Sequence, residues 1–114
     1  MESYIIYESG EIKSVSPLNG EDFSLKELQD AVKGYIEILP IRKRVGVFAF
    51  TSCNGEYIEI DLTKDYIIVM NSDGKFETPV CNNIATVLAA SSCSIMHGDW
   101  IAGSVLICPS KLVR

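Results

Sequence analysis

The chain has 114 residues, of which 47% are hydrophobic and 22% charged, and its formal net charge at pH 7 is −5. This length and composition predict one domain, residues 1–114, with its own core, and they exclude a disordered chain. The negative charge argues against direct binding of a nucleic-acid backbone, which needs a basic face, but it permits a basic protein partner.

The expected location of the protein and the expected role of its cysteines both follow from motifs that the sequence lacks. No apolar run approaches the roughly 20 residues of a membrane-spanning helix, and the acidic first ten residues lack the basic start of a signal peptide. We therefore predict a protein without a membrane anchor in the cytoplasm, or in the host cytoplasm if a phage encodes it. The cysteines, Cys53, Cys81, Cys93 and Cys108, include no Cys-x-x-Cys pair and are expected to be buried apolar residues.

The chain begins with a predicted β-hairpin and a strongly marked helix. Tyr4–Tyr7 and Ile12–Val15 flank a Ser-Gly turn, which is typical of a hairpin. A helix is predicted over Leu25–Lys33, because Ser24 and Glu27 have the spacing of a reciprocal capping box. The glycine at position 34 is expected to end this helix in the left-handed conformation.

Three further strands are predicted in the middle of the chain. The first, Tyr35–Leu39, ends before Pro40, and the next two, Val45–Phe50 and Tyr57–Leu62, flank an Asn-Gly turn. These last two strands form a second hairpin, which we predict to be an insertion spanning residues 41–65.

The second half of the chain predicts strand, turn, helix and strand. Tyr66–Met70 is almost wholly apolar, which indicates a strand buried on both faces, and a Ser-Asp-Gly turn follows it. Asn82 or Asn83 is expected to cap the second helix, and Trp100–Cys108 to form the closing strand. The apolar face of this helix is predicted to carry Ile84, Val87 and Leu88.

This order of elements predicts the fold class. Two strands, a helix and a strand precede the inserted hairpin, and a strand, a helix and a strand follow it. We therefore expect an α+β domain in which two helices cover one mostly antiparallel sheet.

Three segments together resemble the domain of unknown function 3846 family. They are AVKGYIEILP, YIIVMNSDGKFETPVCNNIATVLAA and HGDWIAGSVLI. The motif positions here are Gly34–Glu37, Asn71, Asp73-Gly74, Asn83–Thr86, and Gly98-Asp99 with Gly103. The spacing at Asn83 departs from the family pattern by one residue, and residues 42–65 form a longer link than usual. The resemblance implies an origin in a phage, plasmid or integrated element, and it implies no reaction.

Three groups of residues are candidates for a site that binds a small anion such as a nucleotide. The free N–H groups at the start of the second helix would donate hydrogen bonds to a phosphate, the basic run at 42–44 would bind its charge, and aromatic rings would stack on a base. The candidate ligand-binding residues are Tyr35, Arg42, Lys43, Arg44, Asn82, Asn83, Thr86, His97, Asp99 and Trp100. The alternative for each is structural, as a solvated turn, a helix cap or a core aromatic residue.

Catalytic and metal-binding patterns are weak. Cys93, His97 and Asp99 lie on one short predicted loop, whereas known triads bring their members together from separate elements. Zinc ligation by Cys93 and His97, completed by Cys81 or Cys108, lacks the spacing of a structural site. No P-loop or dinucleotide fingerprint occurs. We therefore predict no catalytic residue, no metal and no cofactor.

Three functional hypotheses follow. The first is a non-catalytic accessory binding protein of a phage or mobile element, which counters host defence by sequestering a nucleotide signal or by occupying a host protein. The second is a small enzyme that uses Cys81 or His97, since Cys81 directly precedes a helix start that would activate a thiol. The third is a structural or regulatory interaction domain. A hydrophobic strand edge or the second hairpin also predicts pairing with a second copy, as a homo-oligomer.

Overall fold

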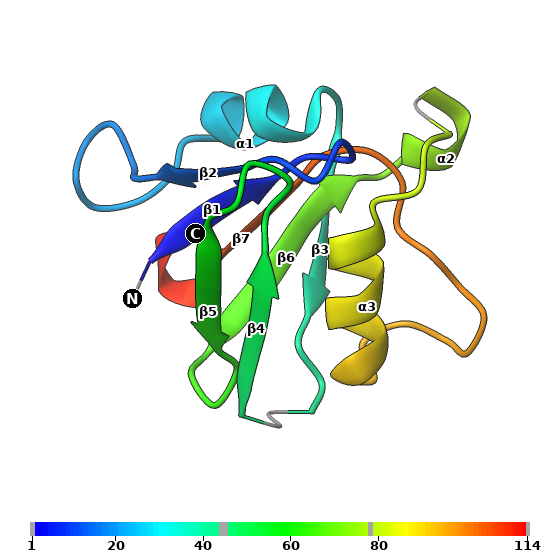
Figure 1. Ribbon diagram of the computed structural model, residues 1–114. Helices are drawn as coiled ribbons and strands as arrows, with labels where there is room; N and C mark the ends of the chain where they lie inside the picture. The colour runs from blue at the N-terminus through cyan, green and yellow to red at the C-terminus, as the bar shows by residue number, and fades with distance from the viewer. Residues whose placement is uncertain (1, 44–45, 78, 114) are drawn as a thin grey trace.

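The computed structural model describes residues 2–43, 46–77 and 79–113 (Figure 1). It confirms the α+β class and the antiparallel character of the sheets. The elements are β1 (Ser3–Ile6), β2 (Ile12–Val15), α1 (Leu25–Val32), β3 (Ile36–Pro40), β4 (Val47–Thr51), β5 (Tyr57–Asp61), β6 (Tyr66–Asn71), α2 (Gly74–Glu77), α3 (Asn83–Ser91), β7 (Val105–Pro109) and the 3-10 turn η1 (Ser110–Leu112).

Five strands form the main sheet in the order β2-β1-β7-β6-β3, and every neighbouring pair is antiparallel. The last strand, β7, inserts between β1 and β6, so that the two most apolar strands are central. As predicted, β6 is buried on both faces, with Ile68 1% and Val69 0% exposed. No helix among the described residues is long and apolar enough to cross a membrane.

The two long helices lie on opposite faces of the sheet. Leu28 and Val32 of α1 pack, with Phe23, against Val69 and Leu106 on one face. The opposite face is covered by α3 together with the β4–β5 hairpin, which lies in front of the sheet in Figure 1. The two long helices therefore cover the sheet as predicted, one on each face.

The second hairpin forms as predicted, although Val45, at its expected start, lies outside the described residues. Its strands pair only with each other, as a separate two-stranded sheet. Ile58, Ile60 and Leu62 turn inward and are 8%, 1% and 0% exposed. Burying three such side chains stabilises the fold by several kcal/mol, at roughly 1.5–3 kcal/mol each. The hairpin thus supplies one layer of the core.

The predicted capping box of α1 is confirmed, but its predicted end is wrong. Ser24 N donates to Glu27 Oε1 at 2.9 Å, and Glu27 N donates to Ser24 Oγ at 3.2 Å. The left-handed residue at the end is Lys33, with φ 62°, rather than Gly34. Gly34 is required for space, because a Cβ there would lie 2.5 Å from Nδ2 of Asn71.

The second half of the chain departs from the prediction in three places. The expected turn after β6 continues into the short helix α2. The closing strand begins at Val105 instead of Trp100, and before it only Ala102 makes an isolated bridge, to Cys81. On α3, Val87 is 54% exposed, and the buried face is formed by Ala85, Leu88 and Ala89. A helix packed closely on a sheet needs small residues at the contact, a requirement that hydrophobicity alone does not show.

Candidate functional site

The predicted cap of α3 is Asn82, and its side chain is fully engaged inside the protein. Nδ2 donates to the carbonyls of Ile6 and Gly103, both at 2.9 Å, and Oδ1 accepts from the Ala85 N–H at 3.1 Å. Asn82 is 1% exposed. This amide therefore connects β1, the segment before β7 and the start of α3, and it has no group available for a ligand.

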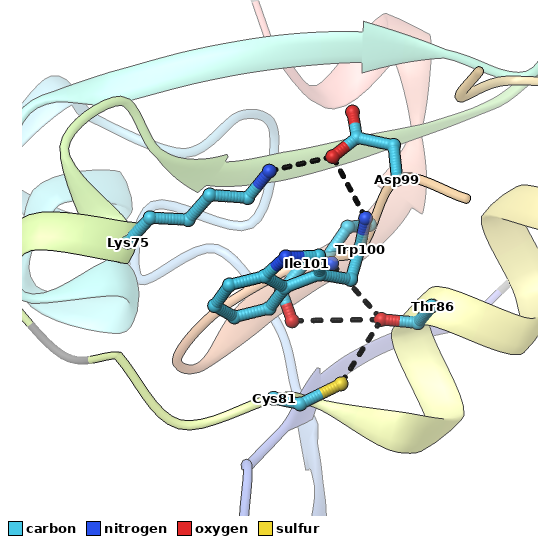
Figure 2. A network of polar contacts seen from close by, with 6 residues as sticks. All are labelled: Lys75, Cys81, Thr86, Asp99, Trp100 and Ile101. Atoms are coloured by element: carbon cyan, nitrogen blue, oxygen red, sulfur yellow. Dashed lines mark hydrogen bonds and ion pairs between the residues drawn. The ribbon is translucent and has the colours of Figure 1, made fainter. Parts of the chain in front are cut away.

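Thr86 ties the loop before β7 to the first turn of α3 (Figure 2). Its Oγ1 accepts from the Ile101 N–H at 2.9 Å and lies 3.7 Å from Cys81 Sγ. Asn83, next to the cap residue Asn82, is exposed. It lines a crevice of about 240 Å³ between α3, the β1–β2 turn and the end of β4. Thr86 thus positions the loop that carries Trp100, while Asn83 faces elsewhere.

Arg42 and Lys43 of the basic run lie at the other end of α3 from the helix start. Arg42 N donates to Ser94 Oγ at 3.2 Å, and Lys43 N donates to Ser92 O at 2.9 Å. Arg44, the third member, lies outside the described residues. Because α3 has nine residues, its two ends are about 13 Å apart. The structure therefore does not bring Arg42 and Lys43 together with the helix start as one phosphate site.

Tyr35 is 71% exposed and lines a shallow hollow of about 480 Å³ between the end of α1 and α2. Trp100 lines a different crevice, so these two rings do not line one cavity in which both could stack on a base. Two of the three remaining candidates, Asp99 and Trp100, do lie together, and they line one polar crevice.

This site, which we call the Trp100 crevice, lies between the ends of β3 and β6, the helix α2 and the loop before β7. Its volume is about 210 Å³. Its charged, amide and aromatic lining residues are Glu37, Asn71, Lys75, Phe76, Asp99 and Trp100. Gly74 holds α2 against the loop, since a Cβ there would lie 2.9 Å from the Ala102 carbonyl.

At one wall of the Trp100 crevice, a lysine is bound to a carboxylate over an aromatic ring. Lys75 Nζ lies 2.5 Å from Asp99 Oδ1 and 4.9 Å from the centroid of the Trp100 ring (Figure 2). The Trp100 N–H also donates to Asp99 Oδ1, at 2.8 Å. The hydrogen bonds from Lys75 and then from Trp100 lower the pKa of Asp99 below its ordinary value. The side chains of Lys75 and Asp99 are 45% and 42% exposed, so water reaches both.

The asparagine in the floor of the crevice connects it to α1. Asn71 is 8% exposed, and its Nδ2 donates to the carbonyls of Val32 and Lys33 at 3.2 and 3.3 Å. Its Oδ1 accepts from the Asp73 N–H at 2.8 Å. The floor is therefore fixed, and the groups free to meet a ligand are the charged and aromatic side chains of the walls.

The reactive side chains considered above are dispersed. His97 is exposed, and its ring makes no hydrogen bond to Cys93, to Asp99 or to any other residue that the structure describes. Cys53 and Cys93 are exposed and Cys81 is partly buried, so the expectation that all four cysteines are buried is confirmed only for Cys108. Burial raises the pKa of the Cys108 thiol to about 12. Within the described ranges no three His, Cys, Asp or Glu residues are grouped to hold a metal ion.

Sequence reasoning missed Glu37, Lys75 and Phe76 as site residues. Lys75 and Asp99 are 24 residues apart in the chain and meet only because α2 rests on the loop before β7. Phe76 could have been noticed in the sequence, because a large apolar residue beside a predicted turn belongs to no predicted strand or helix that would bury it.

Comparisons with models of known protein families, with curated proteins and with solved structures give no match. The resemblance to the domain of unknown function 3846 family stays a prediction.

Proposed function

We propose that the protein is a non-catalytic accessory binding protein of a phage or mobile element, and that it acts by occupying a host protein. The observation that supports this is the Trp100 crevice, a fixed, partly open site with charged and aromatic walls. Phe76, beside it, is 89% exposed. Aromatic side chains next to a defined polar crevice are characteristic of protein interaction sites. The mobile-element origin rests on the resemblance of the sequence.

The charges of the crevice favour a protein partner over a nucleotide. Two acidic residues, Glu37 and Asp99, line the crevice with a single lysine, Lys75, which is already paired with Asp99. A phosphate placed here would meet net negative charge, whereas a basic protein surface would meet complementary charge. Arg42 and Lys43, which would have held a phosphate, lie beside the far end of α3.

Site-specific cross-linking in cells of the native host tests this proposal. A photoreactive benzoylphenylalanine at Phe76, which is 89% exposed, is expected to join one discrete host protein. The matched control places it at Leu18, 90% exposed in the loop before α1, and is expected to yield no such product. Equal products from both positions, or none from Phe76, would contradict the proposal.

The partner identified by mass spectrometry is then purified and titrated. Trp100→Ala is expected to weaken its binding at least about tenfold, as for a central aromatic residue of an interface. The nucleotide hypothesis is tested in parallel by heating the protein with cyclic nucleotides. A rise in melting temperature that disappears in Trp100→Ala would show that a nucleotide binds in the crevice, and would contradict a host protein as its occupant.

A further inference from the structure

The ammonium group of Lys75 occupies the Trp100 crevice in the manner of a bound ligand. It contacts the Asp99 carboxylate at 2.5 Å and lies 4.9 Å from the centroid of the Trp100 ring. A carboxylate beside an aromatic face is the usual arrangement by which proteins recognise organic cations. The protein's own lysine therefore shows which chemistry this wall accepts.

Lys75 is a weakly held occupant. It is carried by α2, a helix of four residues, and both partners of its ion pair are more than two-fifths exposed. Exposed ion pairs and exposed cation–π contacts are each weak, because water and salt screen both. A second cation that makes the same contacts can therefore displace Lys75 at small cost.

The crevice also has a second acidic residue, which does not pair with Lys75. The carboxylate of Glu37 lines it and makes no hydrogen bond or ion pair with any residue in the described part of the chain. Two carboxylates and one aromatic ring suit a planar guanidinium better than a compact ammonium, because a guanidinium donates several hydrogen bonds in one plane and stacks on indole.

We propose that the Trp100 crevice receives an arginine side chain of the partner protein and that Lys75 is its internal competitor. This inference rests on the proposed function, since it names the chemistry by which that partner is recognised. The arginine displaces the Lys75 ammonium from Asp99 and stacks on Trp100, and the released lysine returns to water.

The test uses the capped tripeptide acetyl-Gly-Arg-Gly-amide as the probe. Trp100 is the only tryptophan, so its fluorescence reports binding in this crevice alone. The arginine peptide is expected to change the fluorescence, and the matching glutamate peptide to leave it unchanged. Asp99→Asn is expected to weaken the arginine peptide about fivefold or more, because one charged hydrogen-bond acceptor is lost.

Variants at Lys75 distinguish a competitor from a binding group. Lys75→Ala removes the competitor and is expected to bind the arginine peptide about fivefold more tightly than the wild type. Lys75→Arg keeps a cation in the crevice and is expected to bind no more tightly than the wild type. Lys64→Ala, in the exposed turn after β5, removes the same charge elsewhere and is expected to have no effect. Circular dichroism confirms that each variant is folded.

The results separate this inference from the proposed function. Equal or weaker binding in Lys75→Ala, or equal binding of the glutamate peptide, would overturn the arginine inference. If the host protein still cross-links at Phe76 and still depends on Trp100, the proposed function survives that result. If the arginine peptide binds as expected but no host protein cross-links, the chemistry of the crevice stands and the proposed function fails.

Discussion

Two polar clusters each bind the loop before β7, through Gly103 and through Asp99, yet they differ in what surrounds them. The amide of Asn82 is buried, and its three hydrogen bonds join separate elements of the fold. The Lys75–Asp99 pair is open to water and joins two surface segments. A buried hydrogen bond is costly to lose because its partners are left unsatisfied, whereas an exposed ion pair exchanges readily with water. The first cluster stabilises the fold, and the second is available for recognition.

The largest effect is expected at the buried cluster. Asn82→Ala removes the cap of α3 and leaves the carbonyls of Ile6 and Gly103 without their donor, so we expect a loss of about 3 kcal/mol in the free energy of unfolding. Urea denaturation measures it. Asn83→Ala, at the exposed neighbour, is expected to change stability by less than about 0.5 kcal/mol. If Asn82→Ala loses no more stability than Asn83→Ala, the buried amide does not stabilise the fold in the way described.

A second buried amide, that of Asn71, extends the comparison to the end of α1. Gly34→Ala places a Cβ 2.5 Å from Asn71 Nδ2, and we expect a loss of about 2 kcal/mol from this overpacking. If the clash is the cause, the double variant with Asn71→Ala loses less stability than the sum of the two single variants, as a double-mutant cycle measures. Strict additivity would show that the clash is not the cause.

Alkaline pH is expected to weaken the buried core without a mutation. Burial raises the pKa of Cys108 to about 12, and burial together with the hydrogen bond to Glu2 raises the pKa of Tyr4 to about 12. Between the ordinary values, about 8.5 for Cys and 10 for Tyr, and pH 12, the folded state holds protons that the unfolded state releases. Stability is therefore full below about pH 8.5 and falls as the pH rises, by about 1–2 kcal/mol between pH 8 and 10.

Urea denaturation at pH 8, 9 and 10 measures this loss, and Cys108→Ala serves as the control. The variant is less stable at every pH, but its decline between pH 8 and 10 is expected to be shallower because one of the titrating groups is gone. An equally steep decline in the variant would show that Cys108 does not contribute. In the native protein a thiol reagent is expected to modify the exposed Cys53 and Cys93 and to leave Cys108 unmodified.

The smallest effect on stability is expected at the exposed cluster. Lys75→Ala is expected to change the free energy of unfolding by less than about 1 kcal/mol. The same variant is expected to differ from the wild type in the pH at which Asp99 becomes protonated. Since Lys75 lowers the pKa of Asp99, their contact persists below the ordinary value of about 3.9 and is lost as the pH falls through the lowered pKa.

An acid titration of Trp100 fluorescence follows that loss. The midpoint is expected below about pH 3.9 in the wild type and closer to it in Lys75→Ala, where only the Trp100 N–H still favours the charged carboxylate. Identical midpoints in the two proteins would mean that Lys75 and Asp99 do not interact in solution.

The features that the sequence predicted well depend on neighbours in the chain. The capping box of Ser24 and Glu27 and the cap at the start of α3 follow from spacings of three residues. The unbroken apolar run of β6 likewise indicates a central strand, whatever packs on it. Such local patterns specify main-chain structure, and the order of most helices and strands could be predicted from them.

The features that were missed depend on partners distant in sequence. Asn71 bonds Val32 from 39 residues away, which is why space, and not left-handed geometry, requires Gly34. Asn82 was a candidate for ligand binding because helix caps carry free polar groups, but tertiary packing buries it. Whether a polar side chain is left exposed is decided by the contacts around it, and for Lys75 and Asp99 those contacts come from two separate segments.

Pro40 at the end of β3 bears on the behaviour of the protein at high concentration. β3 is an edge strand, and since the Tyr35 carbonyl accepts from Ser72 N, the main-chain groups of Ile36, Ile38 and Pro40 face away from the sheet. Proline has no N–H, so the row of donors that would template another strand stops short. Pro40 therefore shortens the edge that β3 offers to a further strand, and with it the risk of edge-to-edge association on this side of the sheet.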